Sequence, residues 1–215
     1  MAELSVDLNR SARVVLTLRR RGVTDNGVLK ALETVSRAAF LDPDLEHLAF
    51  ELCPLPAPCG QTAFTQETAG HLLQACEFGE GVGKALVVGA GCGYLPALVA
   101  EFATQVFAVE RFARMAAHAE RAFGDLGADT IALRVGDGLT GWAEHAPFDR
   151  ILLTGAVDEA PEALLGQLSP GGRLTAWVGA PDSGHLTIVD ANGGQMRLPA
   201  RLDLPSLIAG PASAL

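Results

Sequence analysis

Short apolar runs alternate with segments of helical periodicity through the middle of the chain. The apolar runs are 85–88, 106–109, 131–135 and 148–153, and the helical segments are 66–76, 96–102, 115–123 and 164–168. Strands that are apolar on both faces are typical of parallel sheets covered by helices on both sides. The pattern therefore predicts an α/β fold with a doubly wound, mostly parallel, Rossmann-like sheet.

The chain before this region has a different, helical pattern. Apolar residues at 28, 32 and 35 share one helical face behind a cap at Thr24 or Asp25, and Asp42-Pro43 predicts a second helix start. Residues 53–61 hold three prolines and a glycine, which predicts a connecting loop.

The C-terminal part predicts an antiparallel portion of the sheet. Three segments have the pattern of strands joined by turns: 171–178, 185–190 and 195–201. Asn192-Gly193 is a hairpin signal between the last two. We therefore expect a main domain over residues 62–215, with the helical segment and Pro-rich connecting loop of residues 1–61 packed on it.

Composition and charge exclude several classes of protein. With 49% apolar and 19% charged residues, the 215-residue chain is no disordered protein and can bury a full core. A net charge of −9 suits neither a nucleic-acid nor an anionic membrane partner. The N-terminus has no signal-peptide pattern, and glycines and a proline interrupt the longest apolar stretch. Four cysteines without a CxxC predict reduced thiols in a cytoplasmic protein and no metal site.

A glycine-rich loop follows the first apolar run. Residues 88–94 read Val-Gly-Ala-Gly-Cys-Gly-Tyr, and glycines let the backbone turn tightly against a ligand. Glu110 ends the next strand, about 20 residues after the first glycine, where a carboxylate can accept from two ribose hydroxyls. Asp137, between two glycines, follows the third strand and can accept from an adenine amino group. This order of residues predicts a nucleoside site.

Tyr94 narrows the choice of ligand. A dinucleotide fingerprint has glycine at this position, where the helix starts close to a pyrophosphate. Tyrosine there favours a ligand without phosphates, and S-adenosylmethionine has adenosine and an amino acid only. The candidate cofactor-binding residues are Gly89, Ala90, Gly91, Gly93, Tyr94, Glu110, Arg111, Asp137 and Gly138.

Several motifs resemble those of the protein-L-isoaspartate O-methyltransferases. They are Phe40 with 45–49, 54–56, 60–62 (Gly-Gln-Thr), the glycine loop, 109–111, 136–138 with 141–142, 147–150, 161–165 and 171–174. The resemblance implies the fold of class I methyltransferases and binding of S-adenosylmethionine. It also implies methyl transfer to the carboxylate of L-isoaspartyl residues in damaged proteins, a repair reaction whose partners are proteins or peptides bearing isoaspartate.

The acceptor side departs from the family pattern. Phe64 stands where the family has a serine, and Leu52 stands where an aspartate precedes Pro-Leu-Pro. The remaining hydroxyls on this side are Thr62, Thr65 and Thr154, which we take as the candidate catalytic residues. The loss of the serine hydroxyl predicts normal cofactor binding with reduced isoaspartyl methyl transfer.

Three other functions remain open at this point. The protein could methylate a different carboxylate or small molecule, or bind the cofactor without catalysis. It could also be a nicotinamide-dependent oxidoreductase, which Tyr94 disfavours. The sequence predicts no particular oligomeric state.

Overall fold

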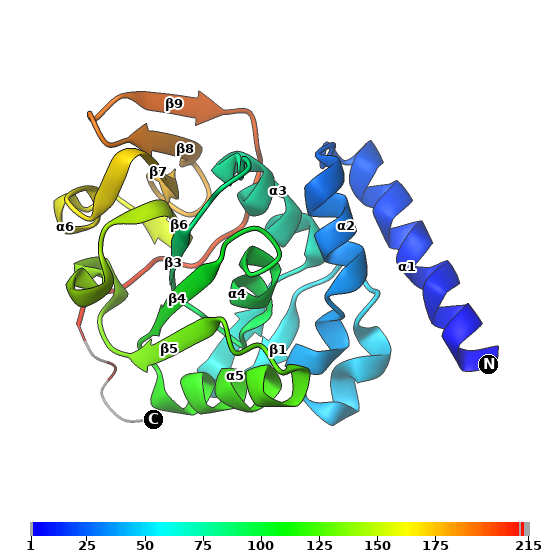
Figure 1. Ribbon diagram of the computed structural model, residues 1–215. Coiled ribbons are helices and arrows are strands. Elements are labelled where there is room, and N and C mark those ends of the chain that lie inside the picture. The colour runs from blue at the N-terminus through cyan, green and yellow to red at the C-terminus, as the bar shows by residue number, and fades with distance from the viewer. Residues whose placement is uncertain (1, 211, 213–215) are drawn as a thin grey trace.

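The computed structural model describes residues 2–210 and 212, with side chains for residues 10–210 and 212. Its centre is a seven-stranded sheet in the order β5-β4-β3-β6-β7-β8-β9 (Figure 1). The strands are β3 (Lys84–Val88), β4 (Gln105–Glu110), β5 (Ile131–Val135), β6 (Phe148–Val157), β7 (Leu168–Val178), β8 (His185–Asp190) and β9 (Gln195–Leu198). β3 to β7 pair in parallel, and β8 and β9 add antiparallel pairs. The predicted mostly parallel sheet with an antiparallel end is confirmed.

Helices cover the sheet, and α2 lies between α1 and the rest of the molecule in Figure 1. The α-helices are α1 (Ala2–Arg20), α2 (Asn26–Thr34), α3 (Gln66–Cys76), α4 (Tyr94–Val99), α5 (Ala113–Leu126) and α6 (Glu162–Leu165). The 3-10 turns are η1 (Arg37–Phe40), η2 (Pro43–Leu48), η3 (Pro58–Gly60), η4 (Gly138–Thr140) and η5 (Ala143–His145). Within the described residues, none of these helices is both long and apolar enough to cross a bilayer.

The sheet separates two apolar cores. In β3, Ala85 and Val87 lie in the core shared with helices α1 to α5, whereas Leu86 and Val88 lie in the core on the other face, with Leu164 of α6. Successive side chains of a strand point to opposite faces. A central strand between two cores must therefore be apolar throughout, which is the pattern that the sequence shows.

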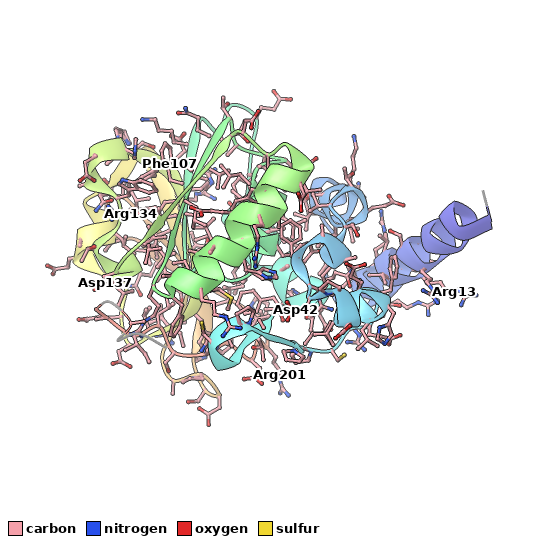
Figure 2. All side chains as sticks on the ribbon, turned by 90° about the horizontal axis from the view of Figure 1, so that it is seen from below. Arg13, Asp42, Phe107, Arg134, Asp137 and Arg201 are labelled. Carbon is pink, nitrogen blue, oxygen red and sulfur yellow. The ribbon has the colours of Figure 1, made fainter. Side chains whose placement is uncertain are left out.

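The N-terminal helices pack into the first of these cores. Asp25 caps α2, because its carboxylate accepts from the Val28 N–H at 2.9 Å. The second expected helix start is wrong in type, since Asp42-Pro43 opens the 3-10 turn η2. Figure 2 shows Arg13 of α1 at the opposite end of the molecule from Asp137.

The Pro-rich segment is more ordered than the connecting loop we expected. It holds a short antiparallel hairpin of β1 (Leu55–Ala57) and β2 (Gln61–Ala63). Pro56 is tolerated in β1 because an edge strand has positions whose N–H groups need no partner. The boundary expected between residues 61 and 62 falls within β2, and the division into two parts stays a prediction.

Asp149 ties together the amino-terminal ends of three neighbouring strands. Its Oδ2 accepts from the backbone N–H groups of Gly83 at 2.9 Å and Lys84 at 3.0 Å, before and in β3. Its Oδ1 accepts from the hydroxyl of Ser169 in β7 at 2.8 Å. Burial alone would raise the pKa of Asp149, but these donors outweigh it and hold the pKa below its ordinary value.

We predict that Asp149→Asn lowers the free energy of unfolding by about 1 kcal/mol at neutral pH, because a neutral acceptor replaces a charged one. A lowered folded-state pKa gives stability that is complete above the unfolded-state pKa and is lost as pH falls through the folded-state pKa. Thermal unfolding curves of parent and variant should therefore begin to converge as the pH falls below about 4. Asp129→Asn, at an exposed position, is the control and should match the parent. A gap between parent and Asp149→Asn that is the same at every pH would contradict this assignment.

Candidate functional site

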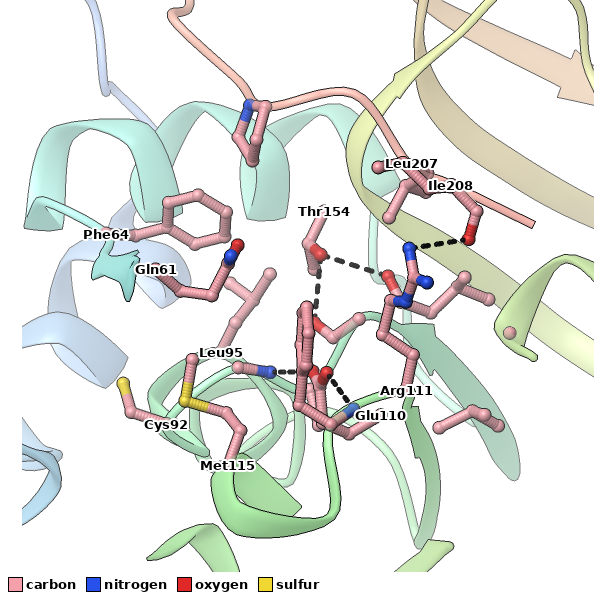
Figure 3. A pocket seen from close by; sticks show the side chains of 18 of the residues that line it. Gln61, Phe64, Cys92, Leu95, Glu110, Arg111, Met115, Thr154, Leu207 and Ile208 are labelled. Carbon is pink, nitrogen blue, oxygen red and sulfur yellow. Dashed lines mark hydrogen bonds between the residues drawn. The ribbon is translucent and has the colours of Figure 1, made fainter. Parts of the chain in front are cut away.

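A pocket opens at the carboxyl ends of β5, β4, β3 and β6 (Figure 3). The strand order reverses between β3 and β6, and open α/β sheets bind ligands at such switch points. The empty volume, including the part open to solvent, is about 990 Å³. The pocket is lined by residues 61–64, 88–92, 94–95, 109–112, 115, 137–139, 154 and 205–208.

Two strands hold the glycine loop from opposite sides. On the β4 side, the N–H groups of Gly89 and Ala90 both donate to the carbonyl of Val109, at 2.8 and 3.1 Å. On the β6 side, the Thr154 hydroxyl lies 3.0 Å from the carbonyl of Val88 and 2.9 Å from that of Gly89. Thr154 therefore lines the pocket while its hydroxyl positions the loop.

The three glycines of the loop serve different purposes. A Cβ on Gly89, which has φ +87°, would lie 2.2 Å from the Thr154 hydroxyl oxygen. A Cβ on Gly93 would lie 2.9 Å from the ring of Phe123 in α5, so Gly93 packs against that helix and does not line the pocket where we expected it. A Cβ on Gly91 would meet no protein atom within 4 Å. The space beside Gly91 is thus open on the pocket side.

The carboxylate of Glu110 is 5% exposed and faces this loop. Its Oε2 accepts from the N–H of Gly91 at 2.9 Å, and its Oε1 accepts from the N–H of Phe112 at 3.0 Å. Burial raises the pKa of Glu110, and the N–H groups of Phe112 and Gly91 counter part of that rise. Each oxygen keeps a second lone pair, so Glu110 can brace the loop and still accept from a ligand hydroxyl.

Asp137 and Arg111 line the pocket and also contact the C-terminal segment. Asp137 accepts from the N–H of Leu139 through Oδ1 at 2.9 Å and from the N–H of Gly210 through Oδ2 at 2.7 Å. Arg111 donates from Nη1 to the carbonyl of Ile208 at 3.4 Å, as the dashed line in Figure 3 shows. Arg111 and Asp137, which we expected to bind the nucleoside, therefore also hold the C-terminal segment at Ile208 and Gly210.

Tyr94 and Gly138 complete this side of the pocket. Tyr94 begins α4 and is 2% exposed, with its ring centroid 5.6 Å from that of Phe40. Burial raises the pKa of the Tyr94 hydroxyl. A Cβ on Gly138 would lie 2.6 Å from the side chain of Val88, so only glycine lets this turn pack on β3.

The other wall is formed by β2 and the residue that follows it. Figure 3 shows Gln61 and Phe64 facing the pocket side by side, and Thr62 also lines it. Thr65, which we expected on this side, is absent from the lining. Its hydroxyl oxygen accepts from the N–H of Thr68 at 3.0 Å and caps α3, because the first N–H groups of a helix need acceptors.

A buried arginine holds this wall against the N-terminal part. Arg37 is 2% exposed and donates to the carbonyls of Glu51 at 2.9 Å, Cys53 at 3.1 Å and Ala63 at 3.2 Å. Burial lowers the pKa of its guanidinium. Because Ala63 belongs to β2, Arg37 connects the hairpin to the segment before it.

Sequence reasoning missed several residues of the pocket. Gln61 had a signal, since it lies in the Gly60-Gln-Thr62 motif, but Met115, Leu139 and residues 205–208 had none. These residues line the pocket only because segments that are far apart in sequence pack against one another. Across the described residues, no three His, Cys, Asp or Glu side chains gather as metal ligands.

The reversed strand order, the glycine loop after β3 and the acid at the end of β4 define the Rossmann-like fold of class I methyltransferases. A sequence profile of the family described as protein-L-isoaspartate(D-aspartate) O-methyltransferase matches residues 9–201. The chain belongs to this family.

Relatives and solved structures agree with this placement. A Paracoccus denitrificans protein-L-isoaspartate O-methyltransferase is 41% identical over 174 residues, covering 81% of this chain and 80% of that protein. One from Azorhizobium caulinodans is 36% identical over 218 residues and covers both chains completely. A Plasmodium falciparum structure described as of this family, in complex with S-adenosyl-L-homocysteine, has a TM-score of 0.74 at 20% identity, covering 91% of this chain and 97% of that chain. At that identity, the structural likeness concerns the fold.

We predict that Gly89→Ala lowers the free energy of unfolding by about 2–4 kcal/mol, because the new Cβ meets the Thr154 hydroxyl in a backbone conformation that favours glycine. Gly91→Ala, the matched control, meets no protein atom and should cost only the backbone strain, about 1–2 kcal/mol. Urea unfolding gives both values.

A double-mutant cycle separates the two contributions at Gly89. In a Thr154→Ala background the clash with the hydroxyl is gone, so Gly89→Ala should cost less than in the parent. Strictly additive costs would show that Thr154 does not restrict this position.

Proposed function

We propose that this protein transfers the methyl group of S-adenosylmethionine to the carboxylate of L-isoaspartyl residues in damaged proteins, a repair reaction. Its substrates are proteins or peptides that bear isoaspartate. The observation that supports this function is that one pocket joins the nucleoside-type residues Gly91, Glu110 and Asp137 to the wall that carries Gly60-Gln-Thr62. The cytoplasmic location stays a prediction.

The residues of the pocket fit S-adenosylmethionine. Gly91 leaves open space beside the loop, Glu110 can accept from ribose hydroxyls, and Asp137 can accept from the adenine amino group. The residues that we propose to hold the cofactor are Gly89, Ala90, Gly91, Tyr94, Glu110, Arg111, Asp137 and Gly138. When bound, the cofactor supplies a methyl group activated by a sulfonium.

The protein's task in this reaction is orientation. A carboxylate is already a nucleophile at neutral pH, so no general base is required. The acceptor oxygen must be held in line with the methyl group, and water must be excluded. The Thr62 hydroxyl and the Gln61 amide are the donors on the acceptor wall, and we propose that they orient the carboxylate. Thr154 acts through the loop that it positions.

We predict that Glu110→Ala weakens binding of S-adenosylhomocysteine by about 1–3 kcal/mol, because ribose hydroxyls lose a charged acceptor and the Gly91 N–H loses its partner. Calorimetric titration gives the dissociation constant. Hydroxyl donors favour the ionised carboxylate, so the parent's affinity should also fall as pH drops through the raised pKa of Glu110.

Two variants serve as controls for Glu110. Glu110→Gln keeps an acceptor oxygen and should lose less affinity than Glu110→Ala, with a weaker dependence on pH. Glu101→Ala removes an exposed carboxylate after α4 and should bind as the parent does. An unchanged dissociation constant in Glu110→Ala would refute the cofactor site.

We predict that the parent methylates an isoaspartyl peptide slowly and that Phe64→Ser accelerates transfer by tenfold or more, with unchanged affinity for S-adenosylhomocysteine. Phe64 faces the pocket without a hydrogen-bond donor, and misplacing a reacting group by about 1 Å can cost about a hundredfold in rate. The measurement is transfer of labelled methyl groups to the peptide, with the aspartyl peptide as the negative substrate.

Phe78→Ser is the matched control, because Phe78 is also half-buried but stacks on Phe102 at 4.9 Å, outside the pocket lining. It should destabilise the fold without accelerating transfer. If Phe64→Ser only loses stability, Phe64 is a packing residue. If neither parent nor Phe64→Ser methylates the peptide while both bind S-adenosylhomocysteine, isoaspartyl methyl transfer is refuted, and the protein either methylates another acceptor or binds the cofactor without catalysis.

A further inference from the structure

The C-terminal strap, residues 205–210, runs beside β6 at the pocket. The Ala156 N–H donates to the carbonyl of Pro205 at 2.7 Å, and the Leu207 N–H donates to the carbonyl of Ala156 at 2.8 Å. A Cβ on Gly155 would lie 2.5 Å from the Pro205 carbonyl and 2.9 Å from the Leu207 side chain. Glycine at 155 therefore lets the strap lie directly on the strand.

The other end of the strap is fixed on the far side of the pocket. The Ile208 carbonyl accepts from Arg111, which follows β4, and the Gly210 N–H donates to Asp137, which follows β5. β3 and β4 lie between β6 and β5 in the sheet. The strap therefore runs along the pocket from the β6 side to the β5 side, and Figure 3 shows Leu207 and Ile208 at the edge of the pocket, beside Thr154 and Arg111.

The strap is held by few buried contacts. Leu207 is half-buried, Ile208 is 63% exposed, and Pro205, Ser206 and Ala209 are also exposed. Segments with little buried apolar surface open locally at low free-energy cost. Beyond Leu207, the Gly210–Asp137 hydrogen bond is the strongest contact of the strap, because its acceptor is a carboxylate.

We propose that the C-terminal strap is a gate for the cofactor, closed by Asp137 and Arg111. This rests on the proposed function, in which the same two residues face the nucleoside. In this proposal, a nucleoside ligand passes the strap both when it enters the pocket and when it leaves. Release of Gly210 from Asp137 and of Ile208 from Arg111 opens the path in both directions. The strap thus sets the rates of cofactor exchange more than the affinity.

The test compares rate constants for S-adenosylhomocysteine measured by surface plasmon resonance. A chain ending at Leu207 keeps the bridge to Ala156 and loses both far contacts. Its association and dissociation rate constants should both rise about tenfold or more. Gly210→Ala disturbs the closure more gently, since Gly210 has φ +84° and a Cβ there meets no protein atom. Both of its rate constants should rise by about fivefold.

Gly193→Ala is the matched control, because Gly193 has φ +83° with equally open surroundings but lies in the turn between β8 and β9. Its rate constants should equal those of the parent. A second readout is amide hydrogen exchange in the cofactor-free protein. The amide of residue 210 should exchange faster in Gly210→Ala than in the parent, whereas in Gly193→Ala it should exchange as in the parent.

The outcomes separate the gate from the proposed function. A parent that does not bind S-adenosylhomocysteine overturns both. A parent that binds, with rate constants unchanged by truncation and by Gly210→Ala, overturns the gate alone. A rise in only one of the two rate constants also overturns the gate. That result would mean that the strap changes the affinity for the ligand, whereas a barrier on the exchange path slows association and dissociation alike.

Discussion

The buried carboxylate of Glu110 and the glycine loop depend on each other. Removing a carboxylate from water is costly, which is why the pKa of Glu110 is raised, and N–H donors from Gly91 and Phe112 offset that cost. The same bonds fix the loop on the end of β4, while Thr154 fixes it from β6. The glycine loop and the carboxylate are therefore held in place by bonds within the protein itself.

The acceptor side of the pocket is held by a buried arginine side chain. The β1–β2 hairpin is too small to be stable alone, and Arg37 attaches it to the N-terminal segment through three backbone carbonyls. A charged donor suits this task because it satisfies several carbonyls that would otherwise be buried without partners. Phe64 follows the β1–β2 hairpin in this wall, and it also packs against the core shared with helices α1 to α5. A change at this position thus affects recognition and stability together.

The strap borders the nucleoside side of the pocket. It touches β6 through backbone bonds and reaches the ends of β4 and β5 through side chains that also face the nucleoside side. Thr154 stands below it, between the loop and the tail. In the proposed gate, cofactor exchange is coupled to this weakly held strap, whereas the groups that orient the ligand stay on strand ends.

The sequence by itself determined the sheet, its helices and the glycine-acid pattern of the nucleoside side. These follow from local rules, because side-chain periodicity sets strand and helix, and a glycine turn is encoded by neighbouring residues. It also predicted the helix 66–76 with the residue bounds that α3 has.

Only the tertiary structure decided which of those residues face the pocket. Gly93 meets Phe123 of α5, and residues 205–208 reach the site from the C-terminal part of the chain. These placements depend on contacts between segments far apart in sequence. The spacing of residues along one segment does not indicate which distant segment will pack against it.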